Sequence, residues 1–276
     1  MASSETSTPN AFERWRWNDA YWTSTWPTRE ALTGSATMSL LERLALRDGE
    51  RVLDVGSGAG TTTIEAARSV APSGEVVGAD ISAPLVALAQ RSALRAGAEN
   101  VRFVLADVQT ERVDGGPFDV VMSQFGVMFF EDPVAAFASL RAQVADGGRL
   151  GFACWQAAEK NPWFLGHALA GLVPGRETAP GAHVTGPFAL SDPDEVAALL
   201  GATGWGPASI EAVEATATVP REAIADEGQP AFLGVPTDRL GEARDAVERL
   251  LEGFEVVDGN YRVPIAYFVV SAAAAP

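Results

Sequence analysis

The residues most able to carry chemistry lie in the segment RVLDVGSGAG at positions 51–60. A short apolar run there leads into Gly56, Gly58 and Gly60, and Asp54 stands two residues before the first glycine. Glycine lets a backbone turn sharply and approach a ligand that a Cβ would exclude. A helix that begins directly after such a loop also points its positive end at the ligand. The segment therefore predicts a binding loop for a nucleotide-like ligand.

The spacing of the glycines separates two classes of nucleotide ligand. A dinucleotide fingerprint has the order G-x-G-x-x-G, whereas Gly60 follows Gly58 by only two positions. Hydride transfer is therefore the weaker interpretation, and an NAD-dependent oxidoreductase is kept as the alternative from another class. The threonines at positions 61–63 can cap the helix that follows the loop.

Three further segments read as strands that end in candidate ligand-binding residues. They are EVVGAD at 75–80, VRFVLADV at 101–108 and FDVVMSQFGVMFF at 118–130. Asp80 ends the first of them, twenty residues after Gly60. A carboxylate at this position can accept hydrogen bonds from both hydroxyls of a ribose.

Together the four segments resemble the motifs of class I S-adenosylmethionine (SAM) methyltransferases, over roughly residues 35–155. The pattern D-x-G-x-G-x-G resembles motif I of that family. The resemblance is closest to the branch that includes the ubiquinone/menaquinone biosynthesis methyltransferases and many small-molecule methyltransferases. Two segments, SQFGVMFFEDPVAAF and GRLGFACW, are similar to the fourth and fifth strand regions of that branch. The resemblance implies SAM as the cofactor and S-adenosylhomocysteine as the product.

The resemblance also implies a role for each candidate cofactor residue. In the family, the glycine loop holds the methionine part of the cofactor and the acidic residue before it helps to orient the ammonium group. Asp107 and Val108 would meet the adenine amino group and ring, and Gln124 and Phe125 would emerge beside the methyl group. The predicted cofactor-binding residues are Asp54, Gly56, Ser57, Gly58, Gly60, Asp80, Ile81, Asp107, Val108, Gln124 and Phe125.

The elements that must position these residues follow an alternating pattern. Strand candidates alternate with helical segments, which is typical of a parallel sheet covered on both faces. Helix starts are expected at Ser82 and Asp132, and at Ser191 as part of a capping box with Asp194. We predict an α/β, Rossmann-like fold: a seven-stranded, mostly parallel sheet with helices on both faces, plus a helical/loop cap. The strand candidates are 51–55, 75–79, 101–105, 118–123, 149–155, 209–219 and 262–270.

The 276 residues are expected to form a single domain. We assign residues 36–155 and 191–271 to its core. Ligands of open α/β sheets bind beyond the carboxyl ends of the strands, where inserted segments can form a lid. We therefore assign residues 1–35 and 156–190 to a cap that faces the substrate.

Aromatic residues of the cap and of the strand ends are the candidate substrate-binding residues. An aromatic face within about 6 Å of a sulfonium attracts its positive charge, which favours Tyr21, Trp22 and Trp26. The same rings could instead clamp the first helix to the body of the protein. Phe129 and Trp155 could form an apolar wall for a methyl acceptor or pack in the core, and Phe125 is the best wall candidate.

A general base is optional, because much of the acceleration of methyl transfer can come from holding the two reactants close and aligned. If the acceptor is a hydroxyl of high pKa, a histidine is the usual proton acceptor. The sequence has two histidines, His167 and His183. His183, between Gly181 and Gly186 on a predicted loop, is the candidate catalytic residue, and a surface histidine without such a role is the alternative.

Composition excludes several other classes of function. A net charge of −16 and a pI near 4.5 oppose a nucleic-acid partner. The histidines and the single cysteine, Cys154, stand too far apart to suggest a metal site. One cysteine allows no intramolecular disulfide, and we see neither a signal peptide nor an apolar run long enough to span a membrane. We therefore expect a cytoplasmic protein with a packed thiol at Cys154, and its oligomeric state is left open.

The sequence thus predicts SAM-dependent methyl transfer to a small, largely apolar organic acceptor, on oxygen, nitrogen or carbon. The first alternative is a methyltransferase-fold protein in which bound SAM serves a cyclisation or rearrangement, because fold does not fix function. The second is the NAD-dependent oxidoreductase, and the third is a non-catalytic binding module.

Overall fold

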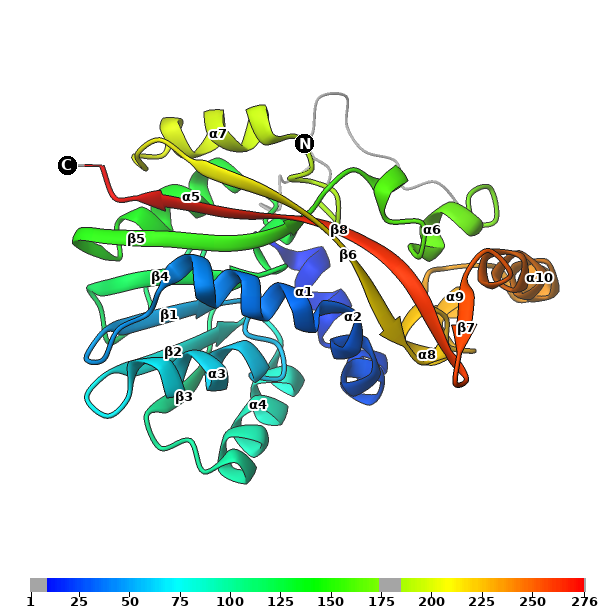
Figure 1. The fold of residues 1–276 in the computed structure, drawn as a ribbon, viewed down its shortest axis with the longest axis horizontal. Helices are drawn as coiled ribbons and strands as arrows, with labels where there is room; N and C mark the ends of the chain where they lie inside the picture. Colours follow the sequence, from blue (N-terminus) through cyan, green and yellow to red (C-terminus); the bar gives the residue numbers. More distant parts are fainter. Residues whose placement is uncertain (1–8, 174–184, 276) are drawn as a thin grey trace, which may run out of the picture.

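The computed structural model describes residues 9–173 and 185–275, and its centre is a mixed sheet of eight strands (Figure 1). The strands are β1 (Arg51–Val55), β2 (Glu75–Asp80), β3 (Val101–Leu105), β4 (Phe118–Gln124), β5 (Val144–Trp155), β6 (Ser209–Val219), β7 (Glu255–Val257) and β8 (Asn260–Ala273). The longer helices are α1 (Ala11–Trp17), α2 (Ala20–Leu44), α3 (Thr61–Val70), α4 (Ala83–Ala96), α5 (Pro133–Arg141), α7 (Pro193–Ala202) and α10 (Leu240–Leu251). Three helices of four residues each are α6 (Leu165–Ala168), α8 (Arg221–Ile224) and α9 (Gln229–Phe232).

The strand order is β3-β2-β1-β4-β5-β8-β6, and β7 pairs with β8 outside this path. The first five strands are parallel, and β8 runs antiparallel between β5 and β6. The predicted Rossmann-like class with a mostly parallel sheet is therefore confirmed. The expected number of seven strands was one too few, because β7 is a three-residue strand with exposed side chains and carries no apolar pattern.

Helices cover both faces of the sheet. On one side α2, α3 and α4 pack on the strands and on one another, and Figure 1 shows α5 and α7 on the opposite side. Because both faces are covered, the central strands bury almost every residue, as Leu53 and Val121 illustrate. Cys154 is also buried, as expected, and burial raises the pKa of its thiol to about 12.

Side chains start most of the predicted helices. Ser82 accepts a hydrogen bond from the backbone N–H of Leu85, and Asp132 accepts one from that of Ala135. Both predicted starts are confirmed. The start at Ser191 is wrong by one residue, because Asp192 is the residue that accepts from the backbone of Asp194 and Glu195.

Helix α2 crosses the boundary that the sequence placed between cap and core. Its 25 residues begin at Ala20 with Asp19 as the N-cap. Its last turns bury Leu40 and Leu44 in the core, whereas its first turns lie against α8. The segment between β6 and β7, assigned to the core on sequence, thus contacts the cap through α8.

No helix in the described part of the chain is long and apolar enough to cross a membrane.

Candidate cofactor and acceptor site

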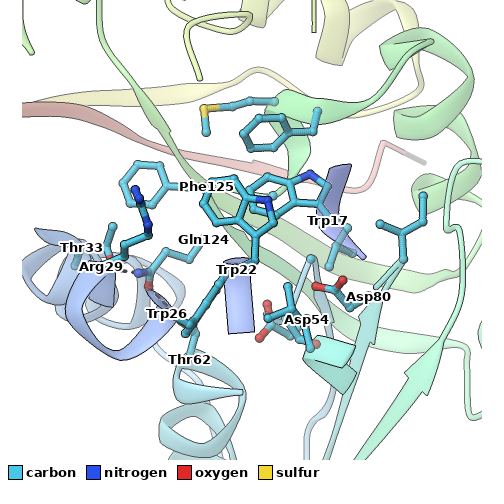
Figure 2. Close-up of a pocket in the computed structure, with 18 of the residues that line it drawn as sticks. Trp17, Trp22, Trp26, Arg29, Thr33, Asp54, Thr62, Asp80, Gln124 and Phe125 are labelled. Atoms are coloured by element: carbon cyan, nitrogen blue, oxygen red, sulfur yellow. Dashed lines mark hydrogen bonds between the residues drawn. The ribbon is translucent and has the colours of Figure 1, made fainter. Parts of the chain in front are cut away.

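A cavity of about 310 Å³ lies at the carboxyl ends of the parallel strands, beneath α1 and α2 (Figure 2). This is a size typical of small-molecule sites. Polar residues from the ends of β1 to β4 form one part of its wall, and aromatic residues form another. Its lining includes Asn10, Glu13, Trp17, Trp22, Trp26, Arg29, Glu30, Thr33, Thr37, Asp54, Gly56, Ser57, Asp80, Ile81, Asp107, Val108, Gln124, Phe125, Met128, Phe129, Phe130, Trp155, Trp163 and Pro187.

The glycine loop joins β1 to α3 and is held by Asp80. Gly58 donates its backbone N–H to Oδ2 of Asp80 over 2.8 Å. Gly56 has a φ of +68°, and a Cβ there would lie 2.9 Å from the Cα of Gly126. The loop and the end of β4 therefore approach more closely than side chains would permit.

Gly58 and Gly60 are required for protein packing and do not line the cavity. A Cβ on Gly58 would lie 2.3 Å from the indole of Trp26, and one on Gly60 would lie 2.7 Å from the ring of Phe103. The sequence explained both glycines by the approach of a ligand. In the structure, side chains of α2 and β3 take that place.

Asp54 and Asp80 are buried carboxylates at the ends of β1 and β2. Burial raises the pKa of Asp54 to about 7, with a smaller contribution from the charge of Asp80, although the hydroxyl of Thr63 donates to its Oδ2. Burial also raises the pKa of Asp80 to about 6, against the stabilising N–H groups of Ser82 and Gly58. Each Asp80 oxygen accepts one N–H and keeps a second lone pair for a ligand hydroxyl.

Asp107, after β3, is already bound by Arg14 of α1 and by Asn10, the residue that precedes this helix. Nδ2 of Asn10 donates to its two oxygens over 2.9 and 3.0 Å, and Arg14 lies 3.3 Å from Oδ2. Asn10 is also paired with Glu131 through reciprocal backbone and side-chain hydrogen bonds. Asn10 therefore gives Asp107 the kind of N–H₂ donor that the resemblance expects from an adenine amino group.

The side chain of Gln124, at the end of β4, forms hydrogen bonds with residues of α2 and α3. Its Oε1 accepts from the hydroxyls of Thr37 and Thr62 over 2.6 and 2.9 Å, and its Nε2 donates to the backbone oxygen of Thr33. Its side chain lines the cavity while its polar atoms bind the protein. Its predicted role beside the methyl group stays a prediction.

Aromatic rings form the part of the wall that adjoins the ends of β4 and β5. Phe125 stacks on Trp155 with ring centroids 4.0 Å apart, and Trp163 packs edge-on against Trp155. Phe129 contacts Trp17 of α1 at 5.1 Å. Phe125 holds a positive φ of 60°, a conformation that costs free energy for a residue with a side chain and that clusters at functional sites.

Of the predicted aromatic cap residues, Trp22 and Trp26 line the cavity and Tyr21 is not among its lining residues. The hydroxyl of Tyr21 donates to Asp226 and accepts from Arg29, and its ring stacks on Phe232. Burial, followed by the bond to Asp226, raises the pKa of Tyr21 well above its ordinary value. Tyr21 joins α2 to the segment after β6.

The predicted catalytic residue, His183, lies outside the described residues. His167 lies on α6 against Phe164 and Phe188, away from the cavity lining. No histidine is among the cavity residues that the described ranges contribute.

Sequence reasoning missed several polar cavity residues, among them Asn10, Glu13 and Arg29. Asn10 and Glu13 precede Trp17 by seven and four positions, and Arg29 follows Trp26 by three. These are helical spacings that place residues on one face. Their spacing from Trp17 and Trp26 was therefore the signal that could have identified them.

Two buried polar atoms around the cavity make no hydrogen bond and so fit a polar ligand. Within the described residues they are Oγ of Ser57 and Nε1 of Trp22, whereas Oε2 of Glu13, which also makes no hydrogen bond, lies 3.7 Å from Nη1 of Arg16. An unsatisfied buried polar atom costs free energy. A cofactor with hydroxyl, amino and carboxylate groups can supply these partners.

Comparisons with known proteins agree with this arrangement. Residues 46–169 match the family model described as "Methyltransferase domain". The aklanonic acid methyltransferase of Streptomyces sp. (strain C5) is 36% identical over 104 residues, 38% of this chain and 47% of that protein. A ubiquinone/menaquinone biosynthesis C-methyltransferase of Stutzerimonas stutzeri (strain A1501) is 39% identical over 111 residues, 40% of this chain and 43% of that protein. The matched segment thus spans less than half the length of both curated relatives.

Solved structures extend the likeness in fold to most of the chain. The crystal structure of a SAM-dependent methyltransferase from Aquifex aeolicus has a TM-score of 0.51 at 16% identity, covering 95% of this chain and 97% of that one. The [4+2]-cyclase SpnF has a TM-score of 0.54 at 20% identity, covering 87% and 80%. The comparisons therefore confirm that the chain resembles the class I SAM-dependent methyltransferases, including those of the ubiquinone/menaquinone branch, and that it has their Rossmann-like fold.

Proposed function

We propose that this protein is an enzyme that transfers a methyl group from SAM to a small, largely apolar organic acceptor. The observation that carries the proposal is a single cavity with two kinds of wall. Buried carboxylates and the glycine loop adjoin the ends of β1 to β3, and aromatic rings adjoin the ends of β4 and β5.

In this proposal the polar part of the wall holds the cofactor. When bound, SAM supplies a methyl group on a positively charged sulfur. Asp80 accepts the ribose hydroxyls through its remaining lone pairs, and Ser57 gains a partner for its buried hydroxyl. Asp54, adjacent to the loop, balances the ammonium group. Asp107 accepts the adenine amino group in the place where Asn10 now donates.

The aromatic part of the wall holds the acceptor. Phe125, Phe129 and Trp155 present apolar surface, which excludes water and orients a flat organic molecule. Because holding two reactants aligned can supply much of the rate acceleration, the chain needs no histidine in the cavity. The proposal covers methylation on oxygen, nitrogen or carbon.

A second candidate function is a cyclisation or rearrangement in which SAM stays intact. The likeness in fold to the [4+2]-cyclase favours keeping it. The two functions differ in one product, because only methyl transfer converts SAM to S-adenosylhomocysteine.

Calorimetric titration of the purified chain with SAM, S-adenosylhomocysteine and NAD tests the cofactor before any acceptor is chosen. We expect micromolar dissociation constants for the first two ligands and no heat of binding for NAD. An acceptor screen that records S-adenosylhomocysteine release then separates methyl transfer from cyclisation. Failure to bind SAM would overturn the proposal, and binding of NAD alone would favour the oxidoreductase.

A further inference from the structure

The charges that line the cavity are unbalanced. Among its described lining residues, five are carboxylic acids and one is a cation, Arg29; the acids are Glu13, Glu30, Asp54, Asp80 and Asp107. A ligand carboxylate brought into this cavity would meet several like charges, and a buried charge without a partner is strongly unfavourable. Glu13 and Asp107 form ion pairs with Arg16 and Arg14, which lie outside the lining. Arg29 is therefore the cation of the described lining that a ligand carboxylate can meet.

Arg29 has donors left for such a ligand. Its Nε donates to Thr25, and its Nη2 donates to Tyr21 and lies 3.1 Å from Asp226. A guanidinium has five N–H groups, and within residues 9–173 and 185–275 the two on Nη1 make no hydrogen bond. The contacts with Tyr21 and Thr25 of α2 and with Asp226, which lies between α8 and α9, hold the guanidinium in place without using these donors.

The position of Arg29 on α2 determines where in the cavity it would meet a ligand carboxylate. Arg29 lies one helical turn from Trp26, which packs on Gly58, and one turn from Thr33, whose backbone oxygen is bound by Gln124. Residues three and four apart share a helix face. Figure 2 shows Arg29 beside Thr33 and Gln124, on the opposite side of the cavity from Asp80. Arg29 therefore faces the region between the glycine loop and the end of β4, away from the ribose carboxylate.

We propose that Arg29 binds the α-carboxylate of the amino-acid part of the cofactor. This inference rests on the proposed cofactor, and it adds a cation to the predicted cofactor-binding residues, none of which carries a positive charge. Asp226 and Tyr21 act as positioning residues that orient the guanidinium.

Titrations with two ligands that differ in this carboxylate test the assignment. S-adenosylhomocysteine contains the amino-acid part, and 5′-methylthioadenosine keeps the nucleoside and sulfur but lacks it. We expect Arg29→Gln to weaken S-adenosylhomocysteine binding by about 30-fold or more and to leave methylthioadenosine binding within about threefold. Because no methyl acceptor is present, a loss seen with the first ligand alone comes from its amino-acid part. Within that part the carboxylate, and not the ammonium group, attracts a guanidinium.

Three further variants make the result specific. Arg43→Gln changes the same residue type on the same helix, where the side chain pairs with Glu211 outside the cavity lining, and should bind like the wild type. Asp226→Asn breaks the Arg29–Asp226 ion pair but keeps the guanidinium, so it should retain most of the S-adenosylhomocysteine affinity. Arg29→Lys keeps the charge without the planar fork and should fall between wild type and Arg29→Gln.

The possible failures are distinguishable. Unchanged S-adenosylhomocysteine affinity in Arg29→Gln, or an equal loss for both ligands in that variant, would overturn the role of Arg29. A wild-type chain that binds neither ligand would overturn the proposed function itself, before any variant is compared. Thermal unfolding of each variant checks that the fold is kept.

Discussion

At the scale of single residues, Asp54 is the group whose charge state is most open to change near neutral pH. It lies buried beneath the glycine loop, and burial raises the pKa of its carboxyl to about 7. The ligand-free protein therefore holds a proton there in mildly acidic solution. A cationic ligand group beside Asp54 would favour the ionised form.

This raised pKa predicts a pH dependence of stability. Asp54 loses its proton near pH 4 when unfolded and near pH 7 when folded, so the folded state holds more protons in between. Its contribution to the free energy of unfolding is complete below pH 4 and is lost as the pH rises through 7. The difference in unfolding free energy between wild type and Asp54→Asn should therefore change by on the order of 1–3 kcal/mol between pH 5 and pH 8, with the wild type losing stability relative to the variant. Denaturant unfolding at the two pH values measures this difference, and a constant difference would contradict the assignment.

At the scale of elements, the contact between α2 and the glycine loop accounts for the glycine at position 58. Trp26 lies where a Cβ of Gly58 would be, and its Nε1 donates to Glu30 over 2.9 Å. Glu30 in turn accepts from the hydroxyl of Thr61 at the start of α3. Helix α2 is thereby joined to both ends of the loop.

The contact predicts a coupled pair of mutations. Gly58→Ala should lower the free energy of unfolding by roughly 2–4 kcal/mol, because the new methyl group meets Trp26 and the positive φ disfavours alanine. Replacing Trp26 by alanine removes the steric part, so Gly58→Ala should cost only about 1–2 kcal/mol in that background. Denaturant unfolding of the two single variants and the double variant gives the coupling. Simple additivity would show that Trp26 does not restrict this position.

The role of α1 shows what sequence reasoning could not supply at this scale. The tryptophans drew attention to the N-terminal segment, but the hydrogen bonds from Asn10 to Asp107 join residues 97 positions apart. No local pattern encodes such a pairing. Helical spacing could identify the face of α1 that turns inward, but not the strand end that it reaches.

At the scale of the whole molecule, the parallel half of the sheet was predictable and the cap was not. Strands β1 to β4 are mostly apolar, and a polar residue lies at the carboxyl end of each or within two residues of it, so the strands and their carboxyl ends could be located from the chain alone. The cap instead depends on distant contacts such as that of Tyr21 with Asp226, which are 205 positions apart. The sequence could therefore not predict that Tyr21 contacts Asp226 or that α8 lies against α2.

Helix α2 packs in the core with one part and lines the cavity with another. This arrangement determines how the cavity can open. Its second half is anchored by Leu32, Leu40 and Leu44, and Pro27 interrupts the hydrogen-bond ladder between the two halves. The first half and α1 can therefore separate from the sheet in a local opening whose free energy is below that of global unfolding.

Amide hydrogen exchange would detect this local opening. We expect the amides of residues 11–30 to exchange well before those of 32–44, and saturating S-adenosylhomocysteine to slow the first group selectively. Equal protection along the whole helix would mean that ligands can enter only when the core itself unfolds. With the expected gradient, access to the site becomes a property of residues 11–30, and it can be tuned there without altering the stability of the sheet.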